Sequence, residues 1–92
     1  MPTIVPAATR TMLLLEVFAR ERRELSNSDL ARLMDLPESS CSDLLYTLHD
    51  MGYLLRTARS KRFYPTARLL DIAKEISASD PLFAVATESR EL

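Results

Sequence analysis

Apolar side chains recur every three or four positions in four stretches of the chain, which is the spacing of one face of an α-helix. The pattern predicts helices over residues 10–22, 27–34 and 38–51, and helical spacing returns after residue 66. On the first three helices, a hydrophobic stripe is expected to face a shared core. The predicted stripes are Met12, Leu14, Leu15, Phe18 and Ala19, then Leu30, Leu33 and Met34, then Cys41, Leu44, Leu45, Leu48 and Met51.

Capping and breaking residues mark the ends of these helices. Ser26 precedes Asp29 by three positions, a spacing that lets a serine accept a hydrogen bond from a first-turn amide. Thr9 is a candidate for the same role before the first helix. Pro37 ends the second helix because proline lacks an amide hydrogen, and it suits the first turn of the third. Gly52 is expected to stop the third helix because glycine tolerates the left-handed conformation.

After the third helix the period of the pattern shortens. Residues 53–56 and 62–65 are short aliphatic or aromatic runs, separated by "TARSK". They predict a two-stranded hairpin with a basic tip. Thr66 is placed to cap the helix that follows, and Ser79 or Asp80 to cap a last segment.

The predicted order of elements is helix, helix, tight turn, helix, hairpin, helix. Two helices joined by a short corner form a helix-turn-helix, and a hairpin after the third helix forms a wing. The predicted fold is therefore mostly α: a winged helix-turn-helix with three helices, a two-stranded wing and a C-terminal linker helix. The predicted division is a flexible N-terminus at 1–8, the winged helix-turn-helix domain at 9–78 and the linker helix at 79–92.

Composition argues against an enzyme or a metal protein in this chain of 92 residues. Cys41 and His49 are the only residues of their kinds, so they form neither a zinc cluster nor a nucleophile with its base. Gly52 is the only glycine, which excludes a glycine-rich phosphate loop. We therefore expect no catalysis, no metal and no cofactor. No apolar run is long enough to cross a bilayer, and a lone cysteine suits a reducing cytoplasm, so we expect a cytoplasmic protein without membrane contact.

Charge is distributed unevenly along the chain, although the net charge is only −1. Residues 26–52 carry five acidic side chains and one basic side chain, whereas residues 53–68 carry five basic side chains and no acidic one. The basic block coincides with the predicted hairpin. It could attract phosphate, or it could be a solvated loop.

The third predicted helix follows the corner, which is the position of a helix that enters a DNA major groove. Small hydroxyl residues at its start allow close approach and can bond to phosphates or bases, although serine also simply starts helices well. Arg10, at the start of the first helix, is a weaker candidate for a phosphate contact. The predicted DNA-binding residues are Ser39, Ser40, Ser42, Asp43, Tyr46, Thr47, Arg56, Arg59, Lys61 and Arg62.

Three stretches, "TRTMLLLEVFA", "LSNSDLARLMDLPESSCSDLLYTLHDMGYL" and "RFYPTARLLDIA", together resemble the N-terminal domain of IclR-type bacterial transcription regulators. The resemblance implies a homodimer that binds a palindromic double-stranded DNA operator, with the third helix in the major groove and the wing on the backbone. It also implies a small-molecule effector bound by a larger C-terminal domain. That domain is absent from this sequence, so we interpret the chain as the DNA-binding fragment of a longer regulator.

Two residues depart from the family pattern. Glu38 and Asp43 stand where members commonly carry basic residues. A carboxylate is repelled by phosphate, but it can also accept a hydrogen bond from the amino group of cytosine. The acidic third helix therefore leaves open a second function class, a winged-helix protein-interaction module without strong DNA binding.

Overall fold

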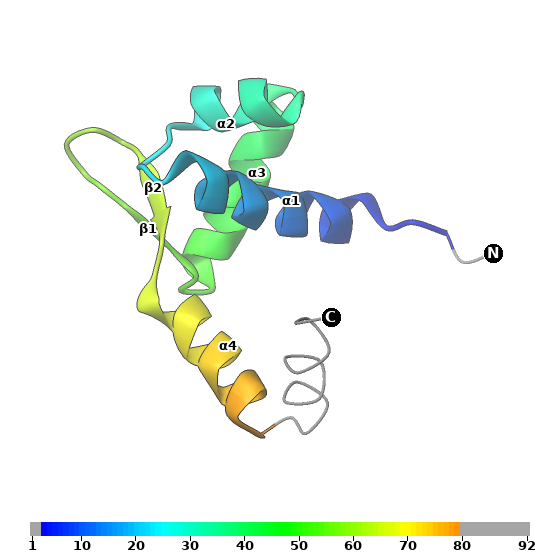
Figure 1. Ribbon diagram of the computed structural model, residues 1–92. Helices are drawn as coiled ribbons and strands as arrows, with labels where there is room; N and C mark the ends of the chain where they lie inside the picture. The colour runs from blue at the N-terminus through cyan, green and yellow to red at the C-terminus, as the bar shows by residue number, and fades with distance from the viewer. Residues whose placement is uncertain (1–2, 80–92) are drawn as a thin grey trace.

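Four helices and one two-stranded antiparallel sheet make up residues 3–79, the part of the chain that the computed structural model describes (Figure 1). This architecture is the predicted mostly helical winged helix-turn-helix. The segment expected to follow Ser79 as a linker lies outside the described residues. In chain order the elements are α1 (Pro6–Glu21), α2 (Asn27–Met34), α3 (Glu38–Asp50), β1 (Leu54–Arg56), β2 (Phe63–Pro65) and α4 (Ala67–Ser79).

The core lies where α1, α2 and α3 meet the base of the sheet. Helices α1 and α3 contribute buried side chains at helical spacing, α2 contributes two adjacent ones, and each strand contributes one. This arrangement holds α3 against the rest of the domain with its opposite side in solvent. The buried residues are Leu14, Val17, Phe18, Leu25, Leu30, Ala31, Cys41, Leu45, Leu48, Leu54 and Phe63.

Helix α1 departs from the prediction at its start and in its buried stripe. It begins at Pro6, four residues before the predicted start, and no side chain caps it, so the capping role predicted for Thr9 is wrong. Its N-terminal end extends beyond the body of the domain (Figure 1), and Met12 is consequently 61% exposed rather than buried. Val17, which the predicted stripe omits, is buried instead. The helix begins this early because residues 7–10 include no proline or glycine that would interrupt it.

The ends of α2 follow local rules. The Ser26 hydroxyl accepts from the Asp29 amide at 3.1 Å, and the Asp29 carboxylate accepts from the Ser26 amide at 3.1 Å, which completes a capping box. These bonds, with Arg23 and Arg32 nearby, hold the pKa of Asp29 below its ordinary value, although partial burial opposes the shift.

The C-terminus of α3 is set by Gly52, as predicted. Gly52 has φ +87°, and the Tyr53 amide reaches back to the Leu48 carbonyl at 2.9 Å. The helix therefore ends at Asp50, and Met51, expected on the inward face, is 55% exposed.

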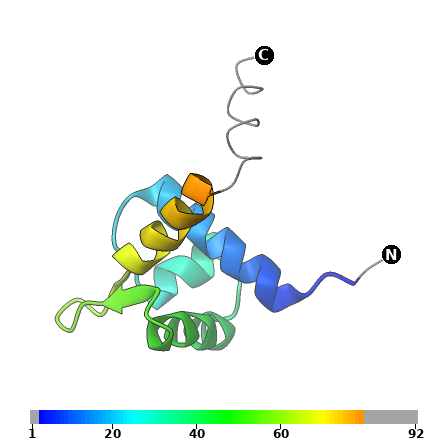
Figure 2. The same cartoon turned by 90° about the horizontal axis from the view of Figure 1, so that it is seen from below.

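The sheet is joined to the link between α1 and α2. Leu25 and Phe63 exchange two backbone hydrogen bonds, of 3.0 and 2.8 Å, as an isolated antiparallel bridge. Both side chains are buried. This bridge anchors the base of the wing beside the helices (Figure 2).

Helix α4 runs away from the body of the domain (Figure 1). Leu70 and Ile76 are 54% and 61% exposed. Thr66, the residue predicted to cap α4, directly precedes it, and its hydroxyl donates to the Gly52 carbonyl at 2.7 Å, which joins the start of α4 to the end of α3. Arg68 attaches the first turn of α4 to the domain by lying over the Tyr53 ring, 5.2 Å from its centroid.

Candidate nucleic-acid interface

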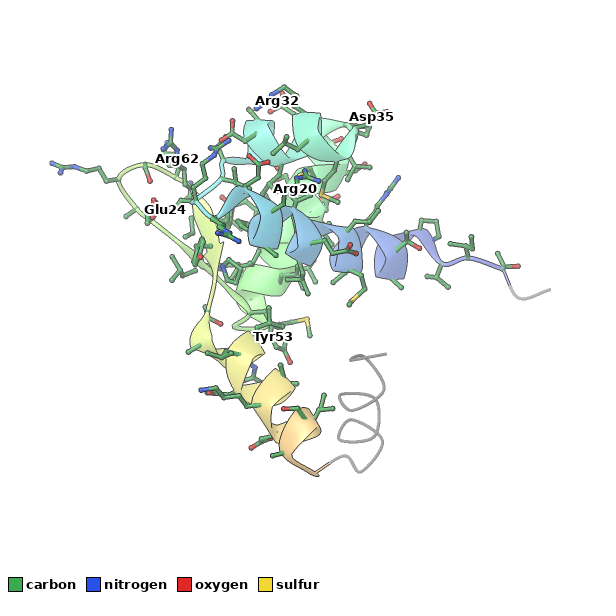
Figure 3. All side chains as sticks on the ribbon, viewed as in Figure 1. Arg20, Glu24, Arg32, Asp35, Tyr53 and Arg62 are labelled. Atoms are coloured by element: carbon green, nitrogen blue, oxygen red, sulfur yellow. The ribbon has the colours of Figure 1, made fainter. Side chains whose placement is uncertain are left out.

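The corner between α2 and α3 is a tight turn built on a left-handed residue. Asp35 has φ 54° and ψ 53°, and the Leu36 amide donates to the Ala31 carbonyl at 2.9 Å. Aspartate is one of the few non-glycine residues that adopt this conformation readily. Pro37 follows in extended geometry and is the N-cap residue of α3. The chain thus reverses within three residues and starts α3 at a fixed angle to α2 (Asp35 is labelled in Figure 3).

Hydrogen bonds from α2 hold the first turn of α3. The Ser28 hydroxyl donates to the Glu38 carboxylate at 2.8 Å, and the Asn27 amide nitrogen donates to the Glu38 carbonyl at 3.1 Å. Glu38 therefore joins the two helices of the motif, and its carboxylate is engaged within the protein.

One side of α3 faces solvent along its whole length. Ser39, Asp43, Tyr46 and Asp50 follow one another at helical spacing, and all four are exposed. Asp50 is absent from the predicted DNA-binding residues, although the same spacing of the sequence would have found it. We call this set the outward face of α3. Apart from the side chain of His49, which lies beside it, α3 carries no basic group.

The remaining predicted residues of α3 lie at the margins of the outward face. Ser40 and Thr47 lie on the margin toward α1, where both line a groove between the two helices. Ser42 is half-buried on the opposite margin. The Thr47 hydroxyl donates to the Asp43 carbonyl at 2.7 Å, so its donor is used within the helix.

Tyr46 connects α3 to the wing. Its ring lies edge-on to Phe63, with centroids 5.6 Å apart. The Arg56 guanidinium lies over both rings, 5.8 Å from the centroid of Tyr46 and 6.0 Å from that of Phe63. Arg56 is therefore held at the base of the wing by cation–π contacts, not presented at its tip.

The tip of the wing is a hydrogen-bonded loop. The Thr57 amide donates to the Arg62 carbonyl at 2.9 Å, and the Lys61 amide donates to the Thr57 carbonyl at 2.8 Å. The Thr57 and Ser60 hydroxyl groups also form a hydrogen bond. This backbone holds Arg59, Lys61 and Arg62 exposed at the end of the hairpin (Arg62 is labelled in Figure 3).

The described residues offer little other chemistry. Residues 3–79 contain no group of three or more His, Cys, Asp or Glu side chains that could hold a metal ion. None of the helices in this range is long and apolar enough to span a membrane.

Cys41 is fully buried. Burial raises the pKa of its thiol, and the nearby Glu38 charge raises it further. Its environment is therefore that of a small buried hydrophobic residue, not a reactive thiolate.

The comparisons with known proteins agree with this geometry. A family model described as the IclR helix-turn-helix domain matches residues 7–58. An IclR transcriptional regulator from Alicyclobacillus acidocaldarius has a TM-score of 0.83 at 17% identity, over 94% of this chain and 35% of that chain. An IclR family transcriptional regulator from Brucella abortus has a TM-score of 0.77 at 26% identity, over 92% of this chain and 32% of that chain. The chain thus spans about a third of the length of these regulators. No curated protein sequence matches it.

Proposed function

The chain belongs to the IclR helix-turn-helix family, and from this premise we propose that it binds an operator in double-stranded DNA with α3 in the major groove and the wing on the backbone. The outward face of α3 supplies base contacts in this arrangement. The exposed cations of the wing tip supply affinity that does not depend on sequence. The function is that of a transcription regulator's DNA-binding domain, not of an enzyme.

The observation that carries the proposal is that the outward face of α3 lies next to the basic wing. Small side chains at the start of α3 leave room for a groove wall, and Tyr46 packs α3 directly against the wing. Arg59, Lys61 and Arg62 extend from that same wing. The DNA phosphates lie on either side of a helix in the major groove. A basic hairpin beside that helix would therefore lie next to the phosphate backbone of the DNA.

The test is titration of duplex DNA over a range of salt concentrations, on the wild type and on Arg59→Ala/Lys61→Ala. We expect the double variant to weaken binding to all sequences about equally. The slope of log affinity against log salt should fall by roughly one unit per lost phosphate contact. Arg20→Ala/Lys74→Ala removes the same charge from exposed positions on α1 and α4 and is the matched control. An equal slope in the wing variant and the wild type would contradict the placement of the wing.

A second candidate function is a protein-interaction module. The observation that favours it is the pair of carboxylates, Asp43 and Asp50, on an outward face that carries no basic group. Such a face repels phosphate and would suit a basic protein partner. A wild-type protein that binds no duplex at low salt would favour this module over the operator-binding function.

We also propose that the regulator acts as a homodimer in the cytoplasm and that any small-molecule effector binds to a separate C-terminal domain. Two-fold symmetry suits a palindromic operator because each half-site then meets the same surface. The comparison regulators are about three times the length of this chain, which leaves room in such proteins for a further domain.

A further inference from the structure

A groove of about 540 Å³ separates the N-terminal half of α1 from α3. Its lining includes the apolar side chains of Leu44 and Leu48 of α3. It also includes polar side chains from both helices: Ser40, Asp43 and Thr47 from α3, and Arg10 and Thr11 from α1. Because Asp43 also belongs to the outward face, the groove opens on the side of α3 that would meet DNA.

Arg10 and Asp43 face this groove without pairing. Neither side chain forms an ion pair or side-chain hydrogen bond with any other group in residues 3–79. Arg10 is half-buried and lines the groove, and its guanidinium has no partner among these residues. It is the basic residue that lines the groove.

The groove and the wing flank α3 on opposite sides. The wing meets α3 through Tyr46, whereas the groove meets it through Ser40 and Thr47. Both views place the wing and the N-terminal end of α1 on either side of α3 (Figures 1 and 2). A helix in the major groove lies between two phosphate backbones. The wing lies on one side of α3, so it can contact only one of these two backbones.

We propose that Arg10 binds a phosphate of the DNA strand opposite the one held by the wing, and that its charge offsets the repulsion between Asp43 and that strand. This inference rests on the proposed operator binding and adds α1 as a third contacting element. Arg10 thereby makes a carboxylate at position 43 tolerable beside DNA. The contact is to the backbone, so it adds affinity without adding base preference.

The experiment compares Arg10→Gln with Arg20→Gln, a matched charge removal on the same helix. Arg20 lies on the part of α1 that faces α2 and pairs with Glu21 at 3.5 Å. We expect Arg10→Gln to lower affinity for cognate and random duplexes alike and to reduce the salt slope by about one unit. Arg20→Gln should leave the slope unchanged. Thermal unfolding of both variants shows whether the fold is retained.

The double variant Arg10→Gln/Asp43→Asn tests the second part of the proposal. Removing the repulsive carboxylate should restore part of the random-duplex affinity lost in Arg10→Gln. If Arg10→Gln keeps the wild-type slope while the wing variant loses slope, Arg10 does not contact DNA and the inference is overturned, but operator binding stands. If the wild type itself binds no duplex, both the proposed function and this inference are wrong.

Discussion

Glu38 and Asp43 look alike in the sequence, as two carboxylates near the start of the same helix, but their surroundings differ. The Glu38 carboxylate accepts a hydrogen bond from Ser28 at 2.8 Å and joins α3 to α2. The Asp43 carboxylate is exposed and has no partner within residues 3–79. Of the two, Asp43 is the one free to accept a hydrogen bond from a base.

We predict that Asp43→Asn reduces preference for the cognate operator, because a base contact of this kind contributes about 1–3 kcal/mol. Binding to random DNA should stay level or rise, since a repulsive charge is lost. Asp43→Arg should shift the preferred base toward guanine, which arginine recognises through two acceptors. Binding-site selection on the wild type and both variants measures these preferences.

Glu38→Gln is the matched control for Asp43→Asn, since it removes a charge on the same helix while its side-chain oxygen can still accept from Ser28. It should select the same operator as the wild type. If the wild type, Asp43→Asn and Asp43→Arg all select one sequence, Asp43 does not read bases. The acidic outward face would then need another explanation, such as a protein partner.

Among the elements, α2 is the one whose stability depends most on the hydrogen bonds at its ends. Eight residues are too few for a stable isolated helix, so the capping box and packing must hold it. The Asp29 carboxylate accepts from the Ser26 amide and lies 3.7 Å from Arg23. Because Ser28 of α2 holds the first turn of α3, loss of the cap would also loosen α3.

We predict that Ser26→Ala lowers the free energy of unfolding by about 1 kcal/mol. The interactions of Asp29 stabilise the charged carboxylate, so its pKa is lower in the folded state than in the unfolded state. This contribution is therefore complete at neutral pH. It is lost progressively as the pH falls below about 4 and through the lowered pKa of the Asp29 carboxyl in the folded state. Urea unfolding at pH 7 and pH 3 measures both effects.

Asp29→Asn provides the check on this pH dependence. It should lower stability at pH 7 and make the stability less sensitive to pH between 7 and 3 than that of the wild type. A variant whose stability follows the same pH curve as the wild type would assign the acid sensitivity to other carboxylates.

At the scale of the molecule, apolar surface is left uncovered on two helices. Met12 and Leu13 of α1 are 61% and 48% exposed, and Leu70 and Ile76 of α4 are 54% and 61% exposed. Surfaces of this kind commonly mark association sites when they are contiguous. A two-fold partner would cover them and would also suit the palindromic operator proposed above.

We predict that the protein sediments as a dimer at moderate concentration, and that Leu70→Gln/Ile76→Gln shifts it toward monomer. Leu55→Gln, at a 43% exposed position on the wing, is the control and should leave the dimer intact. The dimer would hold two α3 helices roughly 34 Å apart, one turn of DNA. A wild-type protein that stays strictly monomeric at high concentration would contradict this assembly.

Elements whose ends depend on local chemistry could be predicted from the order of residues alone. The bounds of α2 follow from Ser26 before it and the Asp35–Pro37 corner after it, and both were predicted correctly. Gly52 ended α3 within one residue of the predicted position. These features involve residues close in the chain, and their hydrogen bonds and steric limits act whatever the rest of the fold does. The family resemblance was confirmed over residues 7–58, which include these features.

Whether a given side chain is buried or exposed depends on which elements pack over it, and the local pattern of residues does not predict this. Met12 and Met51 lie in apolar stripes but have no element packed over them, whereas Val17 does. The roles of Glu38 and Asp43 separated because Ser28, ten residues earlier, lies beside one of them and not the other. Arg10 came to face α3 through a groove that no sequence spacing describes. Such outcomes depend on how helices cross, and the crossing is set by the packing of the whole core.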